Sequence, residues 1–391
     1  MEETAIGFHY ESDTEILLAE ICKLQMKFGN DPEMTFPRIL TIALGIVPGS
    51  ASIVGAMIDH NKNIFFFGAR KQGNRPLFMG KLRDETMSGR ESVVFASEDY
   101  MMDEFGITEV EEVPPCTLVF VDNRGVLQNY KIPSHSDTGL RHCIFELFYF
   151  AHPLTSFRGA RISRLRMSFG KYLYEQYKDR LGHVEVVLGV PESGLHAALG
   201  FAHASKLPLE HGIVRNHHMG RSFMGENMSE REFRANEKYF VDASVVQDKH
   251  VCLVDDSLVR AITAKLLAQK LRKYKPKSIT FLVASPPIRH ANLYGIDIQD
   301  DGTIAAKDGS IEELKSRLGY DGLHYLDLDN ARKAIADHLP LDREKVLHDN
   351  TFFDTCTFTG EYWHREQMSP FLAVEAAEPP LCLSSTSNLV D

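Results

Sequence analysis

This chain of 391 residues has no long apolar run, no excess of basic residues and no leader-like start. No apolar stretch approaches the roughly 20 residues of a membrane-spanning helix, so we expect no membrane span. Asp and Glu outnumber Lys and Arg by 54 to 43, a net charge of -11, which argues against a nucleic-acid-binding protein. The first residues lack the basic and apolar regions of a signal peptide, so we expect a cytoplasmic protein.

The chain also lacks any Cys-x-x-Cys pair. Its six cysteines are scattered at positions 22, 116, 143, 252, 356 and 382. This spacing favours free thiols in a reducing compartment over a disulfide framework. A hydrophobic content of 43% and a charged content of 25% are ordinary for a globular protein, and the length allows two domains or one large one.

The pattern of apolar residues differs between the two halves of the chain. Residues 36–130 alternate short apolar runs with turns, which predicts a mainly antiparallel sheet with strands at 39–47, 52–58, 63–67, 92–96 and 116–121. Helices are predicted at 13–28 and 98–105. From about residue 158 the units become strand–loop–helix, which predicts a parallel sheet with strands at 184–190, 251–254 and 278–284 and helices ending near 205 and 274.

Two features stand near the end of the sequence. Ser310 and Glu313 have the spacing of a capping box and predict the start of a late helix. Residues 370–391 are rich in Ser, Pro and acidic residues and are predicted to form a disordered tail.

Residues 250–265 are the most informative segment. An apolar run ends abruptly in two carboxylates, Asp255 and Asp256, and a polar loop then leads into a helical pattern. Ligands of α/β sheets bind at such strand ends, where helix N-termini offer N–H groups to phosphate. Two carboxylates ~4 Å apart repel each other by roughly 4 kcal/mol at an effective dielectric near 20. Mg²⁺, sugar hydroxyls or bulk solvent should offset this repulsion. The alternative to a ligand site is a solvated acidic turn that caps the helix.

Five ordered segments resemble the amidophosphoribosyltransferase family, the glutamine-dependent branch of the type I phosphoribosyltransferases. They lie at 143–153, 187–200, 215–223, 254–260 and 284–297. The resemblance implies an α/β type I phosphoribosyltransferase domain, a parallel sheet with flanking helices, at residues 140–345. A partial α+β glutaminase-like domain of the N-terminal-nucleophile type would precede it at 1–135, and a C-terminal return segment would follow at 346–369.

The resemblance also assigns a site for phosphoribosyl pyrophosphate (PRPP). Asp255 and Asp256 would contact the ribose hydroxyls and share Mg²⁺ with Ser193, since hard oxygen ligands suit this cation. Ser193 as a helix N-cap and Pro191 as a turn residue are the alternatives. The remaining PRPP-binding residues on this scheme are Glu192, Gly194, Ser257, Val259, Arg260, Thr263 and Arg221, with Arg215 as a further phosphate candidate.

Residues 224–249 match the family's flexible lid over PRPP. Arg231 and Lys238 would act catalytically by stabilising charge on the leaving pyrophosphate while closure excludes water. A solvated charged loop is the alternative. The reaction implied is attack of ammonia on the anomeric carbon of PRPP, which releases pyrophosphate and gives phosphoribosylamine.

The loop departs from the family at two positions. Ala261 replaces a glycine, at a cost of about 1–2 kcal/mol if that position needs a positive φ. Ile262 replaces a small polar residue and loses a bond to phosphate worth about 1.5–3 kcal/mol. Together these changes predict PRPP binding weaker by roughly two orders of magnitude or more.

The resemblance to the glutaminase domain covers only its second part. The nucleophilic cysteine and the oxyanion segment of the family belong to the first part, so we expect glutaminase activity to be missing. Asp13 matches the acid that holds the glutamine α-amino group and is either a vestigial binding residue or simply a helix N-terminal acid. The family's iron–sulfur cluster needs four cysteines; here only Cys143 matches, beside Asn292, Asp354 and Thr357, so we expect no cluster.

Two hypotheses follow. The first is an ammonia-dependent amidophosphoribosyltransferase of purine nucleotide synthesis, either a natural short form or part of a longer enzyme. The second, motivated by Ala261, Ile262 and the missing nucleophile, is a catalytically impaired paralogue that acts as a nucleotide-binding or regulatory subunit. The resemblance implies purine nucleotides as inhibitors at this site. A half sandwich should expose an edge and an apolar face, and the family's assembly implies a homo-oligomer.

Overall fold

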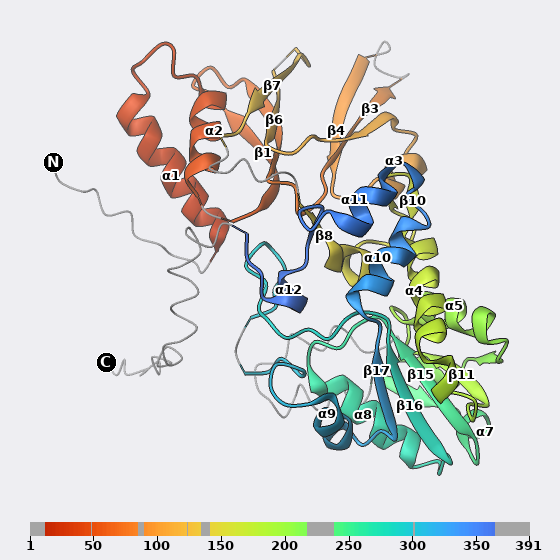
Figure 1. The fold of residues 1–391 in the computed structure, drawn as a ribbon. Helices are drawn as coiled ribbons and strands as arrows, with labels where there is room; N and C mark the ends of the chain where they lie inside the picture. The colour runs from red at the N-terminus through yellow and green to blue at the C-terminus, as the bar shows by residue number, and fades with distance from the viewer. Residues whose placement is uncertain are drawn as a thin grey trace, which may run out of the picture.

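The computed structural model describes residues 12–47, 49–84, 90–122, 124–133, 141–216, 238–299 and 302–363. The chain forms an N-terminal part with two antiparallel sheets and a C-terminal part built on a five-stranded parallel sheet, and short two-stranded pairings complete the described structure (Figure 1). Over the described ranges, no helix has the length and apolar character needed to cross a membrane.

The first antiparallel sheet is covered by helices on one face only. Its order is β1-β2-β6-β7, with bounds Ala51–Ile58, Ile64–Lys71, Thr117–Val121 and Leu127–Lys131. Helices α1 (Asp13–Phe28) and α2 (Phe36–Ile46) pack on the side chains of one face, Phe65 and Phe67 among them. Alternate residues of a strand point to opposite faces, so their neighbours Ile64 and Phe66 point away from the helices. The helix predicted at 13–28 is confirmed.

The predicted strand at 39–47 is wrong, because α2 occupies these residues. Pro37 stands at the first turn of the helix, where the missing N–H costs nothing. Ile39, Leu40, Ala43 and Leu44 are buried at helical spacing. A short apolar run with β-branched members fits either a buried strand or a buried helix, and packing against α1 decides for the helix.

The second antiparallel sheet packs on only part of the other face. Its order is β4-β3-β5, with bounds Arg90–Ala96, Phe78–Asp84 and Thr108–Glu112, and α3 (Tyr100–Glu104) follows β4. Phe95 of this sheet lies against Gly68, where a Cβ atom would approach its ring to 2.5 Å. Beyond that contact an apolar face stays open, and its side chains are 48–67% exposed: Val54, Ile58, Ile64 and Phe66. The predicted exposed apolar face is therefore present.

The parallel sheet is covered on both faces. Its order is β12-β11-β15-β16-β17, with bounds Leu209–Glu210, Val186–Gly189, His250–Asp255, Ser278–Val283 and Gly322–Tyr325. One face packs on α4 (Ile162–Tyr177), α5 (Leu195–Ser205) and α10 (Leu328–Ala336). The other packs on α8 (Ala261–Arg272) and α9 (Ile311–Leu318). This confirms the predicted α/β architecture, and the capping box of Ser310 and Glu313 opens α9.

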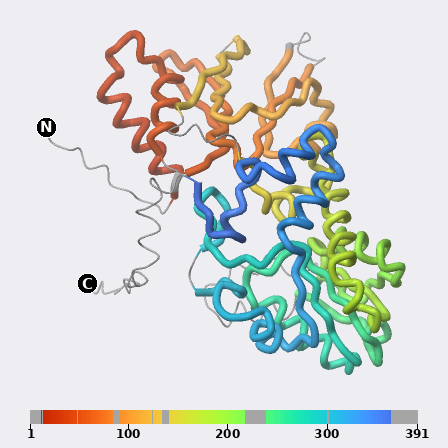
Figure 2. The backbone as a smooth tube through the Cα atoms, viewed as in Figure 1, coloured from red at the N-terminus to blue at the C-terminus, as the bar shows by residue number. Residues whose placement is uncertain are grey.

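The end of the described chain returns to the boundary between the two parts. After α11 (Arg343–His348), strand β18 (Phe353–Asp354) pairs in parallel with β8 (His142–Cys143), and α12 (Cys356–Thr359) follows. Figure 2 shows this C-terminal segment in blue beside the red and orange N-terminal part. Between β8 and α4 lie a π-helical turn, η2 (Glu146–Phe150), and a short hairpin of β9 (Ser156–Phe157) and β10 (Ala160–Arg161).

Candidate functional site

The candidate site lies at the carboxyl edge of two adjacent parallel strands, β11 and β15. Asp255 ends β15, and its Oδ1 accepts hydrogen bonds from the backbone N–H of Asp256 at 2.9 Å and from Ser193 Oγ at 3.4 Å. Asp256 Oδ1 accepts from the backbone N–H of Ser257 at 2.7 Å. The structure thus brings together the three residues predicted to hold Mg²⁺.

Burial is the main influence on the two carboxyl groups. Burial raises the pKa of Asp255 well above its ordinary value, and the adjacent charge of Asp256 raises it further. Burial also raises the pKa of Asp256. Asp256 is only 4% exposed, and its Oδ2 receives no hydrogen bond from any residue that the structure describes. A buried carboxylate oxygen without a donor indicates that a cation or a ligand hydroxyl belongs there.

The loop between β11 and α5 approaches the acidic pair closely at one glycine. A Cβ atom on Gly194 would lie 2.6 Å from the carbonyl oxygen of Val254 and 2.9 Å from the Cα of Asp255. Gly194 is also the N-cap of α5 and provides no side-chain cap, so the positive end of this helix dipole stands at the same edge. The predicted pyrophosphate loop, which includes Glu192, therefore lies beside the acidic pair.

The N-terminus of α8 forms the other side of the site. Arg260 is its N-cap, in an extended conformation and without a side-chain cap bond, and Val259 accepts a backbone hydrogen bond from Ala305. Ala261 is the first helical residue and does not have a positive φ, so the predicted strain at this position is absent. Ile262, also in the first turn, presents an apolar side chain that is 41% exposed. Thr263 lies in the same first turn.

Two cations lie on a small antiparallel ribbon near the acidic pair. Strands β13 (Ile213–Arg215) and β14 (Tyr239–Val241) pair with each other, and Asn216 N–H donates to the Lys238 carbonyl at 2.8 Å. Burial lowers the pKa of Lys238, the charge of Arg215 lowers it further, and the carboxylates of Asp255 and Asp256 raise it. Lys238 is therefore within electrostatic range of Arg215, Asp255 and Asp256.

The last part of the segment predicted as a lid, at 224–249, forms a regular strand and a short helix. Lys238 already belongs to the described part, and β14 and the short helix α7 (Ala243–Val246) follow it. The periodicity of so short a strand and helix is too weak to be recognised in the sequence. Arg221 and Arg231 lie outside the described residues.

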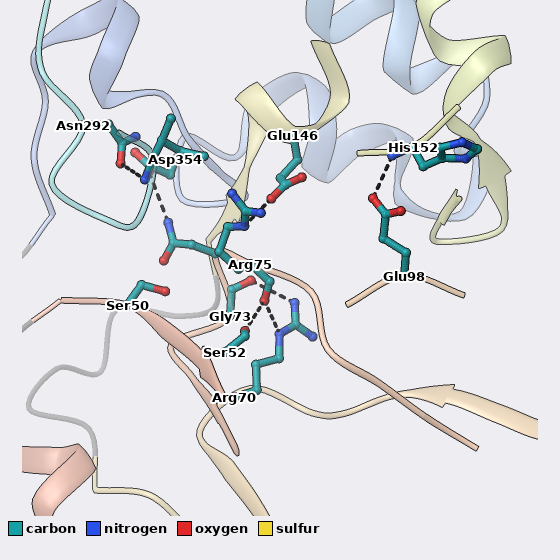
Figure 3. Close-up of polar contacts among 12 residues, drawn as sticks. Ser50, Ser52, Arg70, Gly73, Arg75, Glu98, Glu146, His152, Asn292 and Asp354 are labelled. Carbon is teal, nitrogen blue, oxygen red and sulfur yellow. Dashed lines mark hydrogen bonds and ion pairs between the residues drawn. The ribbon is translucent and has the colours of Figure 1, made fainter. Parts of the chain in front are cut away.

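The four positions compared with iron–sulfur ligands lie in one buried region. Asp354 pairs with Cys143 across β18 and β8, and its Oδ2 accepts from Asn74 Nδ2 at 3.1 Å. Asn292 Nδ2 donates to Cys356 Sγ at 3.6 Å. Thr357 follows Cys356 in α12, and its carbonyl accepts the backbone N–H groups of Arg289 and His290. Figure 3 shows Asn292 and Asp354 side by side. The predicted lack of a cluster stays a prediction, as does the role of Asp13, which begins α1 but whose side chain lies outside the described part.

Sequence reasoning missed two residues that lie near the acidic pair. Tyr239 donates from its hydroxyl to the Pro191 carbonyl at 3.1 Å, which ties the ribbon to the pyrophosphate loop. Arg166 on α4 is 4% exposed, and its guanidinium charge acts on Asp256. The sequence could have indicated Arg166, because a charged residue stands there on the buried face of α4, between Ile162 and Phe169.

Comparison with known proteins gives consistent results. No protein-family model matches the chain. The chain is 30% identical over 342 residues to the chloroplast amidophosphoribosyltransferase of Vigna aconitifolia, covering 87% of this chain and 65% of that protein. It is 30% identical over 362 residues to the amidophosphoribosyltransferase of Bacillus subtilis, covering 93% of this chain and 70% of that protein.

A solved structure agrees with the sequence comparison. The glutamine PRPP amidotransferase of Bacillus subtilis, complexed with ADP and GMP, matches with a TM-score of 0.73 and 27% identity. The match covers 92% of this chain and 72% of that chain. Our chain therefore spans about two thirds of the length of the relatives that it matches.

Proposed function

The chain belongs to the amidophosphoribosyltransferase family, and on this premise we propose that it binds PRPP with Mg²⁺ and transfers ammonia to its anomeric carbon. The observation that carries the proposal is the placement of Ser193, Asp255 and Asp256 at one sheet edge, between the N-termini of α5 and α8. Carboxylates suit ribose hydroxyls and a divalent cation, whereas helix N-termini suit phosphate groups.

The side chains present fit a magnesium ion. Asp256 Oδ2 is a buried oxygen without a donor in the described ranges, and Ser193 Oγ and Asp255 Oδ1, 3.4 Å apart, are further hard oxygen atoms at the same sheet edge. Over the described residues, no group of three or more His, Cys, Asp or Glu side chains forms a metal cage of its own. Mg²⁺ typically keeps waters and substrate oxygens, so sharing it with PRPP agrees with this ligand set. When bound, the ion would neutralise charge on the pyrophosphate group.

The protein's own residues would position the reactants and bind the leaving group. Asp255 and Asp256 would orient the ribose through its hydroxyls, and the loop at Glu192 to Gly194 would hold the pyrophosphate. Attack by the ammonia nitrogen forms the new C–N bond as the C–O bond to pyrophosphate breaks, and the product amine then releases a proton. Lys238 and Arg215 would stabilise the negative charge that develops on the leaving oxygen. Arg231 and Arg221 are proposed to act with them, as in the sequence-based scheme.

The nitrogen donor that we propose is free ammonia. Purine nucleotides are proposed as inhibitors at the same edge, supported by the ADP and GMP named for the Bacillus subtilis structure. A role in purine synthesis, a cytoplasmic location and a homo-oligomer belong to the same proposal.

A direct assay tests this function. The chain is incubated with millimolar PRPP, Mg²⁺ and either NH₄Cl or glutamine, and phosphoribosylamine and pyrophosphate are measured. We expect turnover with NH₄Cl and none with glutamine. If neither NH₄Cl nor glutamine gives turnover, the proposal that the chain is an enzyme is wrong.

Ile262 favours a second candidate function, because its exposed apolar side chain stands at the N-terminus of α8, where the 5′-phosphate of PRPP would bind in our proposal. On this alternative the chain is an impaired paralogue that binds nucleotides without catalysis. Calorimetry with PRPP, AMP and GMP separates the two: binding without turnover supports the paralogue, whereas binding with ammonia-dependent turnover supports the enzyme.

A further inference from the structure

Tyr239 on the β13–β14 ribbon reaches the proposed pyrophosphate loop. Its hydroxyl donates a hydrogen bond to the Pro191 carbonyl at 3.1 Å, and the two residues are 48 positions apart in the sequence. Pro191 stands between β11 and α5, directly before residues 192–194 of that loop. The bond therefore acts on the loop from the side of the ribbon.

The side chain of Tyr239 is well fixed. It is only 4% exposed and belongs to the same apolar cluster as Val190 and Ile213. Its backbone is paired opposite Arg215 across the ribbon. A buried ring on a paired strand has little freedom to move, because the interior around it is close-packed. The hydroxyl therefore holds its acceptor, the Pro191 carbonyl, at a defined place.

The ring of the same tyrosine contacts a cation of the candidate site. The ammonium of Lys238 lies 5.0 Å from the centroid of the Tyr239 ring, within the range of a cation–π interaction. Lys238 is one of the cations proposed above to stabilise the leaving pyrophosphate. One side chain thus contacts two groups on the pyrophosphate side of the site, the carbonyl that precedes the loop and the lysine.

The backbone bonds of the loop come from the opposite side. The Val190 N–H donates to the Val254 carbonyl of β15 at 2.9 Å, and the Gly194 N–H donates back to the Val190 carbonyl at 3.0 Å. These bonds shape the loop and join it to the acidic strand, but they do not involve the ribbon. The Tyr239 hydroxyl supplies a contact that relates the loop to the ribbon and so to Lys238.

We propose that Tyr239 is a positioning residue that holds the pyrophosphate loop and Lys238 at a fixed separation, so that both bind one pyrophosphate group. Fixing this separation before the ligand arrives reduces the ordering cost of binding. The ligand-binding consequence rests on the proposed PRPP site, whereas the anchoring of the loop does not.

The proposal predicts a selective effect on ligands. A tyrosine hydroxyl has one proton to donate, and here the Pro191 carbonyl accepts it. The groups proposed for the ribose and the 5′-phosphate, Asp255 and the N-terminus of α8, therefore receive no hydrogen bond from this hydroxyl. Ligands that carry a pyrophosphate group should depend on the Tyr239 hydroxyl, whereas a ligand with a single 5′-phosphate should not.

Two substitutions of Tyr239 separate the hydroxyl from the ring. Tyr239→Phe removes the bond to Pro191 and keeps a ring beside Lys238, whereas Tyr239→Leu removes both contacts. Tyr177→Phe is the matched control, because Tyr177 also donates from its hydroxyl to a backbone carbonyl, that of Tyr325 at 2.9 Å, but lies on α4. Thermal unfolding of each variant defines the temperatures at which it is folded.

The first readout is the affinity of the full chain, with Mg²⁺, for PRPP, inorganic pyrophosphate and AMP, measured by calorimetry. We expect Tyr239→Phe to weaken the binding of PRPP and pyrophosphate roughly two- to tenfold, the range that one neutral hydrogen bond carries. Its affinity for AMP should not change. Tyr239→Leu should weaken the first two ligands further, and Tyr177→Phe should affect none. Equal weakening of all three ligands, which a merely structural role predicts, overturns the proposal, as does an unchanged affinity for PRPP.

The second readout needs no ligand. Hydrogen exchange of the peptide that spans 189–196 reports on the N–H groups of Val190 and Gly194, which form the backbone bonds of the loop. We expect faster exchange there in Tyr239→Phe than in the parent chain and no change in Tyr177→Phe. If the parent binds none of the three ligands, the proposed function fails, and the exchange alone decides whether Tyr239 anchors the loop. Unchanged exchange in Tyr239→Phe shows that it does not.

Discussion

Replacing Ile262 by serine tests whether the N-terminus of α8 lacks a side-chain hydrogen-bond donor for phosphate. Ile262 is the second residue of the helix and is 41% exposed, so removing its side chain leaves no cavity in the core. A serine hydroxyl there would reach a phosphate bound at the helix N-terminus. A hydrogen bond to a charged group is worth about 1.5–3 kcal/mol, so PRPP should bind roughly 10- to 150-fold more tightly.

Ala261 supplies the matched control for this experiment. Because Ala261 already has a helical conformation, Ala261→Gly relieves no strain and adds no donor. Glycine is less favourable than alanine in helices by up to about 1 kcal/mol. We therefore expect Ala261→Gly to leave PRPP affinity unchanged or slightly weaker. Calorimetric titration of both variants and the parent with PRPP and Mg²⁺ gives the comparison, and tighter binding by Ala261→Gly with no gain for Ile262→Ser would refute this reasoning.

Three further substitutions test the candidate site and the buried carboxyl of Glu146. Gly194→Ala should abolish PRPP binding in calorimetry, because its Cβ would lie 2.6 Å from the Val254 carbonyl; normal affinity would show that the loop adjusts. Asp256→Asn should raise the melting temperature of the ligand-free chain while weakening Mg²⁺-dependent PRPP binding, since it removes one of two repelling buried charges; a lower melting temperature contradicts this. Burial raises the pKa of Glu146 from 4.5 to about 7. The fold therefore favours the neutral carboxyl, which contributes up to about 3 kcal/mol to the free energy of unfolding below about pH 4.5. This contribution is lost as the pH rises to about 7. Urea unfolding of Glu146→Gln should show a smaller fall in stability over that range than the parent, and equal falls would argue against the raised pKa.

The acidic loop was predictable because its signals are local. An apolar strand, two carboxylates and a helical pattern follow one another within 16 residues, from His250 to Lys265. The parallel register of β11 and β15 then places Ser193 beside Asp255, as the order of the motifs indicated. The order of motifs along the sequence was therefore enough to predict that Ser193, Asp255 and Asp256 lie together.

Other features depend on contacts between distant segments. The run in α2 reads equally well as a strand until α1 packs on it. Arg166 donates a hydrogen bond to the Leu147 carbonyl and is influenced by the charge of Asp256. No spacing in the sequence relates these three positions. Cys356 joins Asn292 only because β18 returns to β8. The conformation of Ala261 likewise required coordinates, since alanine fits both a loop and a first helical turn.

The open apolar face of the first sheet has a consequence for how the chain behaves in solution. Val54, Ile58, Ile64 and Phe66 form this face, while the molecule as a whole carries a net charge of -11. At low ionic strength, like charge keeps copies apart despite the exposed hydrocarbon. Salt at 0.15 M shortens the range of that repulsion to about 8 Å, and apolar attraction is not screened. Light scattering of the purified chain should therefore increase with added salt, and purification is best carried out in dilute buffer.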